Sequence, residues 1–559
     1  MQTINMIRTW NVGLLCFLTL TGAYAQQTGK IDSQEITVEK SRRIELPPAV
    51  RLLNKIPSPR ANTDVRKLTY EFQDRKLTIG DPRIVPAMLP ATATDGTDVP
   101  AGLTNYVKLG AGNYNSFYGE GFYATTVAGS LGVEASARHL SSGLGPVDGA
   151  NSAQRETRLN LSGTYATDLV KATASLGFEQ ERYFFYGYRP QFADGVRQVP
   201  NRDSLRQQLT SFRVGLVLEN AGKDQTLDYT LKTNLTTLRD AYRASETDWS
   251  TSLQTSLLLT EKVVALLNAD AQITQRTDAA VDNRNLFRIR PAFRYAAPGL
   301  TVTLALNAVN ETDTRQGINQ TRAFPVVHLD AVPGGSVHFF AGLDGDVVRH
   351  TLRSLLAENR WLASNVVLAN TIKLYDVYLG SKGQLGNGFS YEGKVSYARY
   401  RNLNTVNNAW PDTSKFAALY DGGLAQVLTI SGQAGYAPTE AFTSTVKADF
   451  FRYDLDRLEE AWGRPRASVQ WLNRYSLQKK LFITADAYLH AGILNKNFIS
   501  GELIRLPTIV DANLKIDYFL GKHVSAFVSL NNIFGQSYQR YLYYRVQGLN
   551  FLGGISYSF

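Results

Sequence analysis

The chain has almost no cysteine and no long hydrophobic run after its first residues. Cys16 is the single cysteine among 559 residues. A chain with one cysteine forms no internal disulfide and offers no set of thiolates for a metal. No stretch beyond the N-terminus approaches the roughly 18 apolar residues that a transmembrane helix needs. These absences exclude a disulfide scaffold and a helical membrane protein.

Motifs for catalysis and for metal binding are also missing. The chain has 6 histidines, at 139, 328, 338, 350, 490 and 523, and none has the HExxH or HxxxH spacing of a zinc site. The serine-hydrolase motif GxSxG is absent, and "GLDGD" (342–346) lacks the spacing of a calcium loop. His490 is in phase with Asp486 on an alternating segment, which permits a catalytic dyad but favours a hydrated polar pair. We therefore expect neither an enzyme nor a resident metal or cofactor.

The N-terminus has the pattern of a secretory signal peptide over residues 1–25. Arg8 precedes the apolar core "VGLLCFLTL", and "AYA" (23–25) forms a cleavage site before Gln26. Leu15 stands before Cys16 where a lipoprotein needs a small residue, so we expect no lipid anchor at this cysteine. The formal charge of +10 suits contact with anionic lipid or lipopolysaccharide at a cell surface. Export and the lack of any binding motif argue against nucleic acid as a partner.

From about Asn105 onward the hydrophobic pattern has a period of two, and we expect the barrel to span residues 103–559. In "LTVTLALNA" (300–308), Leu300, Val302, Leu304 and Leu306 alternate with polar or small residues. Such alternation predicts strands with one apolar face and one polar face. Many of the runs are about 11–16 residues long, which suits strands that cross a bilayer at a tilt. The expected fold is an all-β transmembrane antiparallel barrel.

The connections between these runs alternate between tight and long. Tight connections include 128–130, 297–299, 478–480 and 521–523, and long ones include 141–153, 185–204, 278–284, 313–322, 350–366 and 494–506. Outer-membrane barrels have short periplasmic turns and long extracellular loops. Pairing each turn with a loop predicts about 22 strands, with 16 to 22 acceptable. Pro325 falls inside one of these strands, where it weakens the prediction because proline cannot donate to a strand ladder.

The last strand ends on a bare aromatic residue. Phe551, Ile555, Tyr557 and Phe559 fall on one side of an extended "NFLGGISYSF", and we expect that side to face lipid. A terminal aromatic in such a strand is the feature by which the barrel-assembly machinery is expected to recognise its substrates. We interpret these four residues as a C-terminal assembly signal.

The closing segment resembles the last hairpin of TonB-dependent receptors. The family pattern N-[LI]-F-x-x-x-Y corresponds here to Asn532, Ile533, Phe534 and Tyr538, and its terminal pattern to Gly548, Phe551, Gly554, Tyr557 and Phe559. "NYVKLGAGNYNSFYGEGFYA" (105–124) is similar to the first hairpin of those barrels. The resemblance covers residues 103–559. It implies a barrel in the outer membrane of a Gram-negative bacterium that takes up a nutrient or chelate and engages TonB.

The N-terminal region departs from that family. Receptors of this kind carry a large plug domain before the barrel, whereas residues 26–102 hold no plug signature and are interrupted by prolines. "EITVEKS" (35–41) is only loosely similar to a TonB box. We expect 26–102 to be a periplasmic or lumenal extension that helps to close the barrel. The alternative function is a non-transporting barrel subunit of an assembly, secretion or surface complex, with a companion outer-membrane or periplasmic protein.

One aromatic cluster and one helical pattern stand out among the long connections. "RYFFYGYRP" contains Tyr183, Phe184, Phe185, Tyr186 and Tyr188. These aromatics could contact a ligand or a partner, but we favour the aromatic girdle of an outer-membrane barrel. "TLRSLLAENRWL" (351–362) has leucines at helical spacing and predicts a short helix that serves packing.

Overall fold

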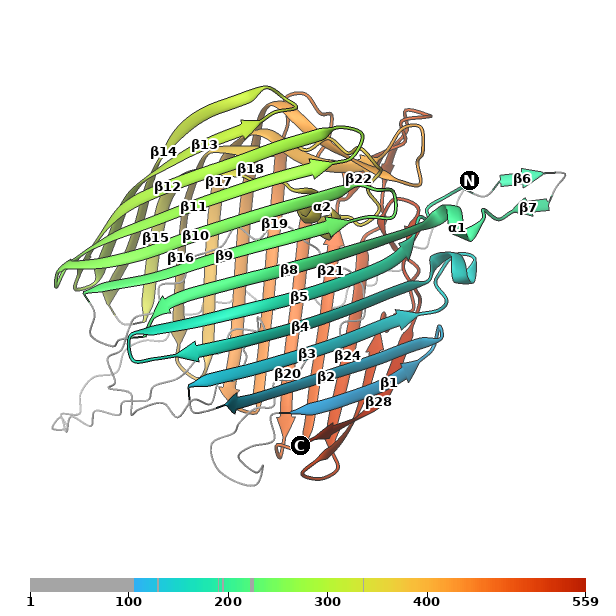
Figure 1. The fold of residues 1–559 in the computed structure, drawn as a ribbon, viewed down its shortest axis with the longest axis horizontal. Helices are drawn as coiled ribbons and strands as arrows, with labels where there is room; N and C mark the ends of the chain where they lie inside the picture. The colour runs from blue at the N-terminus through green and yellow to red at the C-terminus, as the bar shows by residue number, and fades with distance from the viewer. Residues whose placement is uncertain (1–104, 128–129, 190, 194–195, 222–225, 335) are drawn as a thin grey trace, which may run out of the picture. The chain divides into compact units, whose positions relative to one another are not determined.

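The computed structural model describes residues 105–559 except 128–129, 190, 194–195, 222–225 and 335. The expected signal peptide (1–25), the extension (26–102) and the TonB-box-like segment (35–41) lie outside the described residues. Twenty-two strands form one sheet (Figure 1). They are β1 (Tyr106–Gly112), β2 (Ser116–Val127), β3 (Leu131–Ser142), β4 (Gln154–Ala166), β5 (Val170–Phe184), β8 (Arg206–Asn220), β9 (Leu227–Arg239), β10 (Ser245–Thr260), β11 (Val263–Thr277), β12 (Val281–Ala297), β13 (Leu300–Asp313), β14 (Ile318–Gly334), β15 (Val337–Val348), β16 (Thr371–Leu385), β17 (Phe389–Asn408), β18 (Phe416–Thr439), β19 (Phe442–Asp454), β20 (Ala467–Leu477), β21 (Leu481–Ala491), β24 (Ile509–Phe519), β25 (Val524–Asn531) and β28 (Asn550–Ser558).

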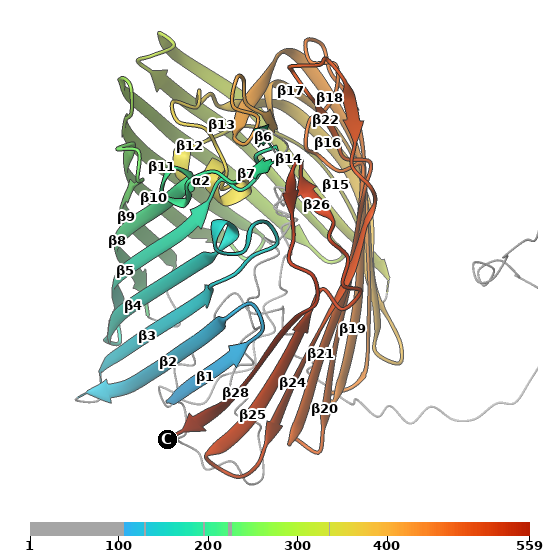
Figure 2. The ribbon, with the colours of Figure 1, turned by 90° about the vertical axis from the view of Figure 1, so that its right-hand side faces the viewer.

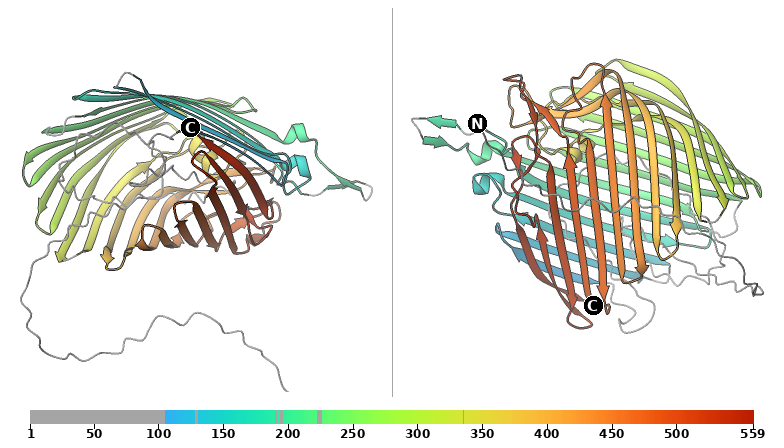
Figure 3. Two further views of the ribbon diagram at one scale, coloured as in Figure 1. Left: turned by 90° about the horizontal axis from the view of Figure 1, so that it is seen from below. Right: turned by 180° about the vertical axis from the view of Figure 1, so that it is seen from behind.

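The sheet closes on itself through its first and last strands. Each strand pairs antiparallel with the next along the chain, and β1 also pairs with β28, with Tyr106 opposite Ser558 and Gly112 opposite Leu552. The blue β1 lies beside the dark red β28 in Figure 3. Closure removes both sheet edges, so every strand has two neighbours. The predicted closed antiparallel barrel of 22 strands is confirmed.

Side chains alternate between the two faces of the wall, as the period of two predicts. In β1 the side chains of Val107 and Leu109 are 45% and 49% exposed, whereas Lys108 between them is buried. The buried face carries charged side chains and the outer face carries large apolar ones. This distribution is that of a barrel with an apolar surround and a polar interior. No helix in the described part of the chain has the length and hydropathy required to cross a membrane.

The two ends of the barrel differ in their connections. At one end, here called the turn end, strands are joined by short turns such as 478–480, and at the other, the loop end, by loops such as 185–205 and 349–370. The prediction of long loops at 278–284 and 313–322 is wrong. The strands there are joined by the short connections 278–280 and 314–317. Their polar residues continue the strands, because strand pairing beyond the apolar band tolerates polar side chains on both faces.

The long loops contain short helices and short hairpins. Helix α1 (Arg202–Leu205), the 3-10 helix η1 (Gly149–Ser152) and the hairpin of β6 (Gln191–Ala193) and β7 (Val196–Gln198) lie at the loop end, as do two further hairpins. These pair β22 (Leu494–Lys496) with β23 (Leu503–Arg505), and β26 (Gln539–Tyr541) with β27 (Tyr544–Arg545). The predicted helix in 351–362 is confirmed as α2 (Leu352–Glu358), in which Thr351 and Ser354 form a capping box.

The strand pairing in the barrel wall changes beside Pro325. This proline lies opposite Leu306 of β13, but pairing of β14 with β15 ends at Val327 opposite Leu343. From this pair toward the loop end, β15 no longer pairs with β14. The missing N–H of Pro325 therefore interrupts no hydrogen-bond ladder with β15. The carbonyl of Gly345 in β15 instead accepts a hydrogen bond from Asn307 on the inner wall, at 2.8 Å. The part of β15 nearest the loop end therefore leads the chain into the barrel.

Candidate functional site: a pocket between the barrel wall and two inward loops

The loop between β15 and β16 (349–370), here called the inner loop, lies inside the ring of strands. Figure 2 shows α2 between the strands β8–β12 and β17–β18. The carboxylate of Glu246 in β10 accepts hydrogen bonds from the backbone N–H groups of Leu352 at 2.6 Å and Arg353 at 3.1 Å. The first turn of a helix has free N–H groups that require acceptors. The barrel wall thus caps the inner helix.

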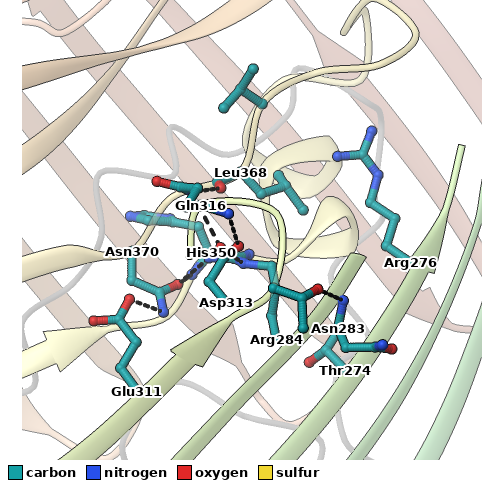
Figure 4. Close-up of polar contacts among 12 residues, drawn as sticks. Thr274, Arg276, Asn283, Arg284, Glu311, Asp313, Gln316, His350, Leu368 and Asn370 are labelled. Atoms are coloured by element: carbon teal, nitrogen blue, oxygen red, sulfur yellow. Dashed lines mark hydrogen bonds and ion pairs between the residues drawn. The ribbon is translucent and has the colours of Figure 1, made fainter. Parts of the chain in front are cut away.

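A buried polar network on β12 and β13 fixes both ends of the inner loop (Figure 4). The guanidinium of Arg284 donates to Asp313 Oδ2 at 2.9 Å, to the His350 carbonyl at 2.5 Å and to Asn370 Oδ1 at 2.7 Å. Asn370 Nδ2 in turn donates to Glu311 Oε1 at 3.0 Å. A planar guanidinium with five donors suits such a three-way junction. The start and the end of the loop are joined to the same arginine.

Arg276 of β11 and Gln316 of the turn between β13 and β14 bind carbonyls in the second half of the inner loop. Arg276 Nη1 donates to the Val366 carbonyl at 2.5 Å, and Gln316 Nε2 donates to the Leu368 carbonyl at 2.6 Å. Arg276 also pairs with Asp278 at 2.8 Å. Loop carbonyls inside a protein need such donors, since they have no strand partner. The sequence offers no local signal for these contacts.

Aromatic side chains join the inner loop to the loop between β25 and β28 (532–549), here called the closing loop. Trp361 stacks on Tyr544, with 4.0 Å between ring centroids and 29° between planes. Tyr186 packs edge-on against both rings, at 5.7 Å and 4.8 Å. Tyr541 also packs edge-on against Trp361, with 5.6 Å between ring centroids. Burial raises the pKa of Tyr544 well above its ordinary value, so its hydroxyl stays protonated and donates to the Ser414 carbonyl.

The interpretation of "RYFFYGYRP" as an aromatic girdle is wrong. Tyr183, Phe184 and Phe185 are 2%, 3% and 2% exposed, and the hydroxyl of Tyr183 donates to the carbonyl of Arg360 in the inner loop. These rings bury their apolar area inside the loop end and face no lipid. Tyr188 donates to Asp148 Oδ2 at 2.5 Å, and burial together with this bond raises the pKa of Tyr188 to about 12. A dense aromatic run is compatible with either packing, and the sequence does not distinguish them.

A cavity of ≈ 300 Å³ lies between the inner loop, the closing loop and the inner face of β20, β21, β24, β25 and β28. Its loop side includes Tyr186, Trp361 and Tyr541. Its wall side includes Gln470 of β20 and Asn531 of β25. Pockets with an apolar surface and a few convergent polar groups are the usual form of small-molecule sites. We therefore treat this pocket as the candidate functional site.

The charged groups of the pocket are engaged in hydrogen bonds. The hydroxyl of Tyr488 donates to Asp511 Oδ2 at 3.0 Å and lies 2.6 Å from the hydroxyl of Tyr538. His490 bonds Ser468 at 3.1 Å, and Asp486 accepts from Asn513 at 2.7 Å. The interpretation of His490 and Asp486 as a hydrated pair is wrong, because each is bonded to a different neighbour and His490 is 2% exposed.

The closing-hairpin motif residues have separate structural positions. Asn532 has a positive φ of 50°, and its Nδ2 donates to the carbonyls of Gln536 and Gln547, both at 2.7 Å. Ile533 and Phe534 are 38% and 55% exposed. Tyr538 reaches the pocket. Asn532 thus closes the base of the loop that carries Tyr538.

The expected assembly-signal residues lie on the outer face of the last strand. Phe551, Ile555, Tyr557 and Phe559 are 44%, 63%, 53% and 45% exposed. Leu552 on the other face is completely buried. Their recognition by the assembly machinery stays a prediction.

Within residues 105–559, gaps excepted, no three His, Cys, Asp or Glu side chains are grouped as ligands for a metal ion. Sequence reasoning missed Glu246, Arg284 and Trp361, which position the pocket. Each is a single residue without a motif, and its partner lies far away in the chain.

The barrel is similar to several solved structures. The FrpB iron transporter from Neisseria meningitidis (F3-3 variant) has a TM-score of 0.63 at 12% sequence identity, and the match covers 81% of each chain. The ferripyoverdine receptor of the outer membrane of Pseudomonas aeruginosa gives 0.60 at 13% identity, over 81% of this chain and 71% of that one. The siderophore receptor PiuA from Acinetobacter baumannii gives 0.60 at 10% identity, over 81% and 82%. At such identities the likeness concerns the fold. No family model matches the chain, and no curated protein matches it in sequence.

Proposed function

We propose that this chain is an outer-membrane receptor-type barrel that takes up a nutrient or chelate through its loop end. The pocket between the wall and the two inward loops is the observation that carries the proposal. It combines aromatic rings with polar groups, and its walls come from strands and loops that are far apart in the chain. The apolar outer face of the barrel supports a place in the outer membrane. The structural neighbours include an iron transporter and siderophore receptors.

A transport function also accounts for a barrel lumen that is partly occupied by the inner loop. A ring of 22 strands without contents is wider than the 16–18 strands that already leave an aqueous channel. The inner loop occupies part of this space and is held by Arg284, Arg276 and Glu246. Residues 26–102 are proposed to occupy the remaining lumen or its periplasmic mouth. Equal single-channel conductance with and without 26–102 would contradict that part of the proposal.

Growth under nutrient limitation tests the function. A strain lacking the gene is compared with strains that carry the intact chain, a chain without 35–41 or the Trp361→Ala variant, across single limiting carbon and iron sources. We expect a defect confined to one class of solute, rescued by the intact chain alone. Mass spectrometry of the outer-membrane protein should find Gln26 at the mature N-terminus if residues 1–25 are a signal peptide.

The second candidate is a non-transporting barrel subunit of an outer-membrane complex. The firm fixation of the inner loop favours it, because a loop that is bonded at both ends to Arg284 resembles a permanent filling. An affinity purification from outer membranes distinguishes the two functions. A stable stoichiometric companion, together with unchanged growth on every solute after deletion of 35–41, would favour the second candidate.

A further inference from the structure

We infer that the pocket recognises a neutral oligosaccharide rather than an anionic chelate, an inference that rests on the proposed function of the pocket as a solute site. The first argument is the chemistry of the wall side. Seven side-chain amides line the pocket: Gln154, Gln470, Asn513, Asn531 and Asn550 from the wall, and Asn532 and Gln547 from the closing loop. An amide offers two donors and two acceptor lone pairs without charge. Such groups match hydroxyls, which both donate and accept.

The second argument is the aromatic surface opposite the amides. Trp361, Tyr186 and Tyr541 line the pocket from the loop side, and their rings are fixed against one another. Rigid aromatic rings give a large contact area at a small entropic cost. A sugar ring presents C–H groups on its faces and hydroxyls at its rim. A pocket with aromatics on one side and amides on the other accommodates both.

The third argument is charge. The lining contains three carboxylates, of Glu358, Asp486 and Asp511, and two guanidinium groups, of Arg360 and Arg540. Arg360 already pairs with Glu181 at 3.1 Å, and Arg540 donates to the Gly463 carbonyl at 3.0 Å. An anionic ligand would meet the carboxylates of Asp486 and Asp511, which accept side-chain hydrogen bonds from neutral groups, and like charges at close range are unfavourable. A neutral ligand avoids this repulsion.

The fourth argument is two buried polar atoms of the lining. Within the described part of the chain, Asn550 Oδ1 and Arg540 Nε have no hydrogen-bond partner, although these residues are 2% and 7% exposed. Buried polar groups in native proteins almost always have a partner from protein, water or ligand. Both residues belong to the lining, so it contains one unpaired acceptor and one unpaired donor, and a hydroxyl group has both functions.

The test uses the full-length protein purified in detergent and an array of neutral oligosaccharides, with ferric citrate and short peptides as parallel probes. Hits are titrated by calorimetry. Within the described part of the chain the Gln470 side chain makes no hydrogen bond, so we expect Gln470→Ala to keep the fold while removing a pocket amide. We expect neutral glycan binding that Gln470→Ala weakens about two- to tenfold. Gln433→Ala, an exposed glutamine of β18 outside the pocket, should leave it unchanged.

The outcomes separate this inference from the proposed function. If ferric citrate or a peptide binds, and Gln470→Ala weakens that binding, the assignment of an oligosaccharide as the ligand is wrong. The proposed role of the pocket in solute recognition then stands. If no glycan of the array binds at millimolar concentration, the inference is overturned. If a glycan binds but Gln470→Ala and Gln433→Ala behave alike, the glycan site lies elsewhere and the assignment to this pocket is wrong.

Discussion

The indole of Trp361 stacks on the phenol ring of Tyr544 with 4.0 Å between their centroids, although 183 positions separate the two residues in the chain. This contact joins the inner loop to the closing loop above the pocket. Both side chains are buried, at 8% and 1% exposure. The two loops therefore form one packed unit, and the shape of the pocket depends on their contact.

Replacing Trp361 by alanine should loosen both loops while the barrel remains intact. Removal of a buried tryptophan costs about 3–5 kcal/mol of local stability. We expect faster hydrogen exchange in 349–370 and 532–549, measured by mass spectrometry, with unchanged heat-modifiable migration of the barrel. Trp471→Ala is the matched control, since this tryptophan is 50% exposed on the outer wall. Exchange that rises equally in both variants would contradict a specific role of the stacking.

Loss of the Glu246 carboxylate should unfold the start of α2. Glu246→Ala leaves the N–H groups of Leu352 and Arg353 without their acceptors, at a cost of about 1–3 kcal/mol. Glu246→Gln retains one carbonyl oxygen and should have an intermediate effect. Amide exchange at residues 352–358 measures the change. Glu261→Gln, in a turn at the opposite end of the barrel, serves as the control, and equal protection of the helix in all variants would exclude the cap.

The wall of the barrel was predictable because its signal is local. Alternation of Leu300, Val302 and Leu304 with polar residues identifies a two-faced strand without any knowledge of its neighbours. The turn at 167–169 was missed, since "TDL" contains neither glycine nor proline. Strand ends were misjudged where polar residues continue the pairing, as in β12 and β13.

The interior was not predictable because its contacts join distant segments. Arg284 and Asn370 lie 86 positions apart, and nothing in either neighbourhood marks the other. The aromatic run Tyr183–Tyr186 gave a clear signal with an ambiguous meaning. Rings of this kind occur both in an interfacial girdle and in buried packing, and only the direction of the chain beyond β5 decides between them.

Exchange of Arg284 for lysine should open the lumen. The ammonium group of a lysine cannot donate hydrogen bonds to Asp313, the His350 carbonyl and Asn370 at the same time. It lacks the planar, forked set of donors of a guanidinium. Freed at both ends, the inner loop should leave the interior more often. We expect larger and more frequent conductance steps in planar bilayers. Arg474→Lys, at an exposed arginine of β20, is the control, and identical conductance of the two variants would show that the network does not hold the loop.

Removal of Phe559 should reduce insertion into the outer membrane. Its backbone N–H donates to the Asn105 carbonyl at 2.9 Å beside the junction of β1 and β28, and its exposed ring stacks on Tyr557. Loss of this residue removes a terminal aromatic that the assembly machinery is expected to bind, while Phe559→Tyr retains one. Surface protease shaving measures the inserted fraction. Leu520→Ala, at a more exposed site in the turn between β24 and β25, 63% against 45% for Phe559, should insert normally. If the truncated chain refolds in detergent as well as the intact one, the defect lies in recognition; normal surface levels would refute the assembly signal.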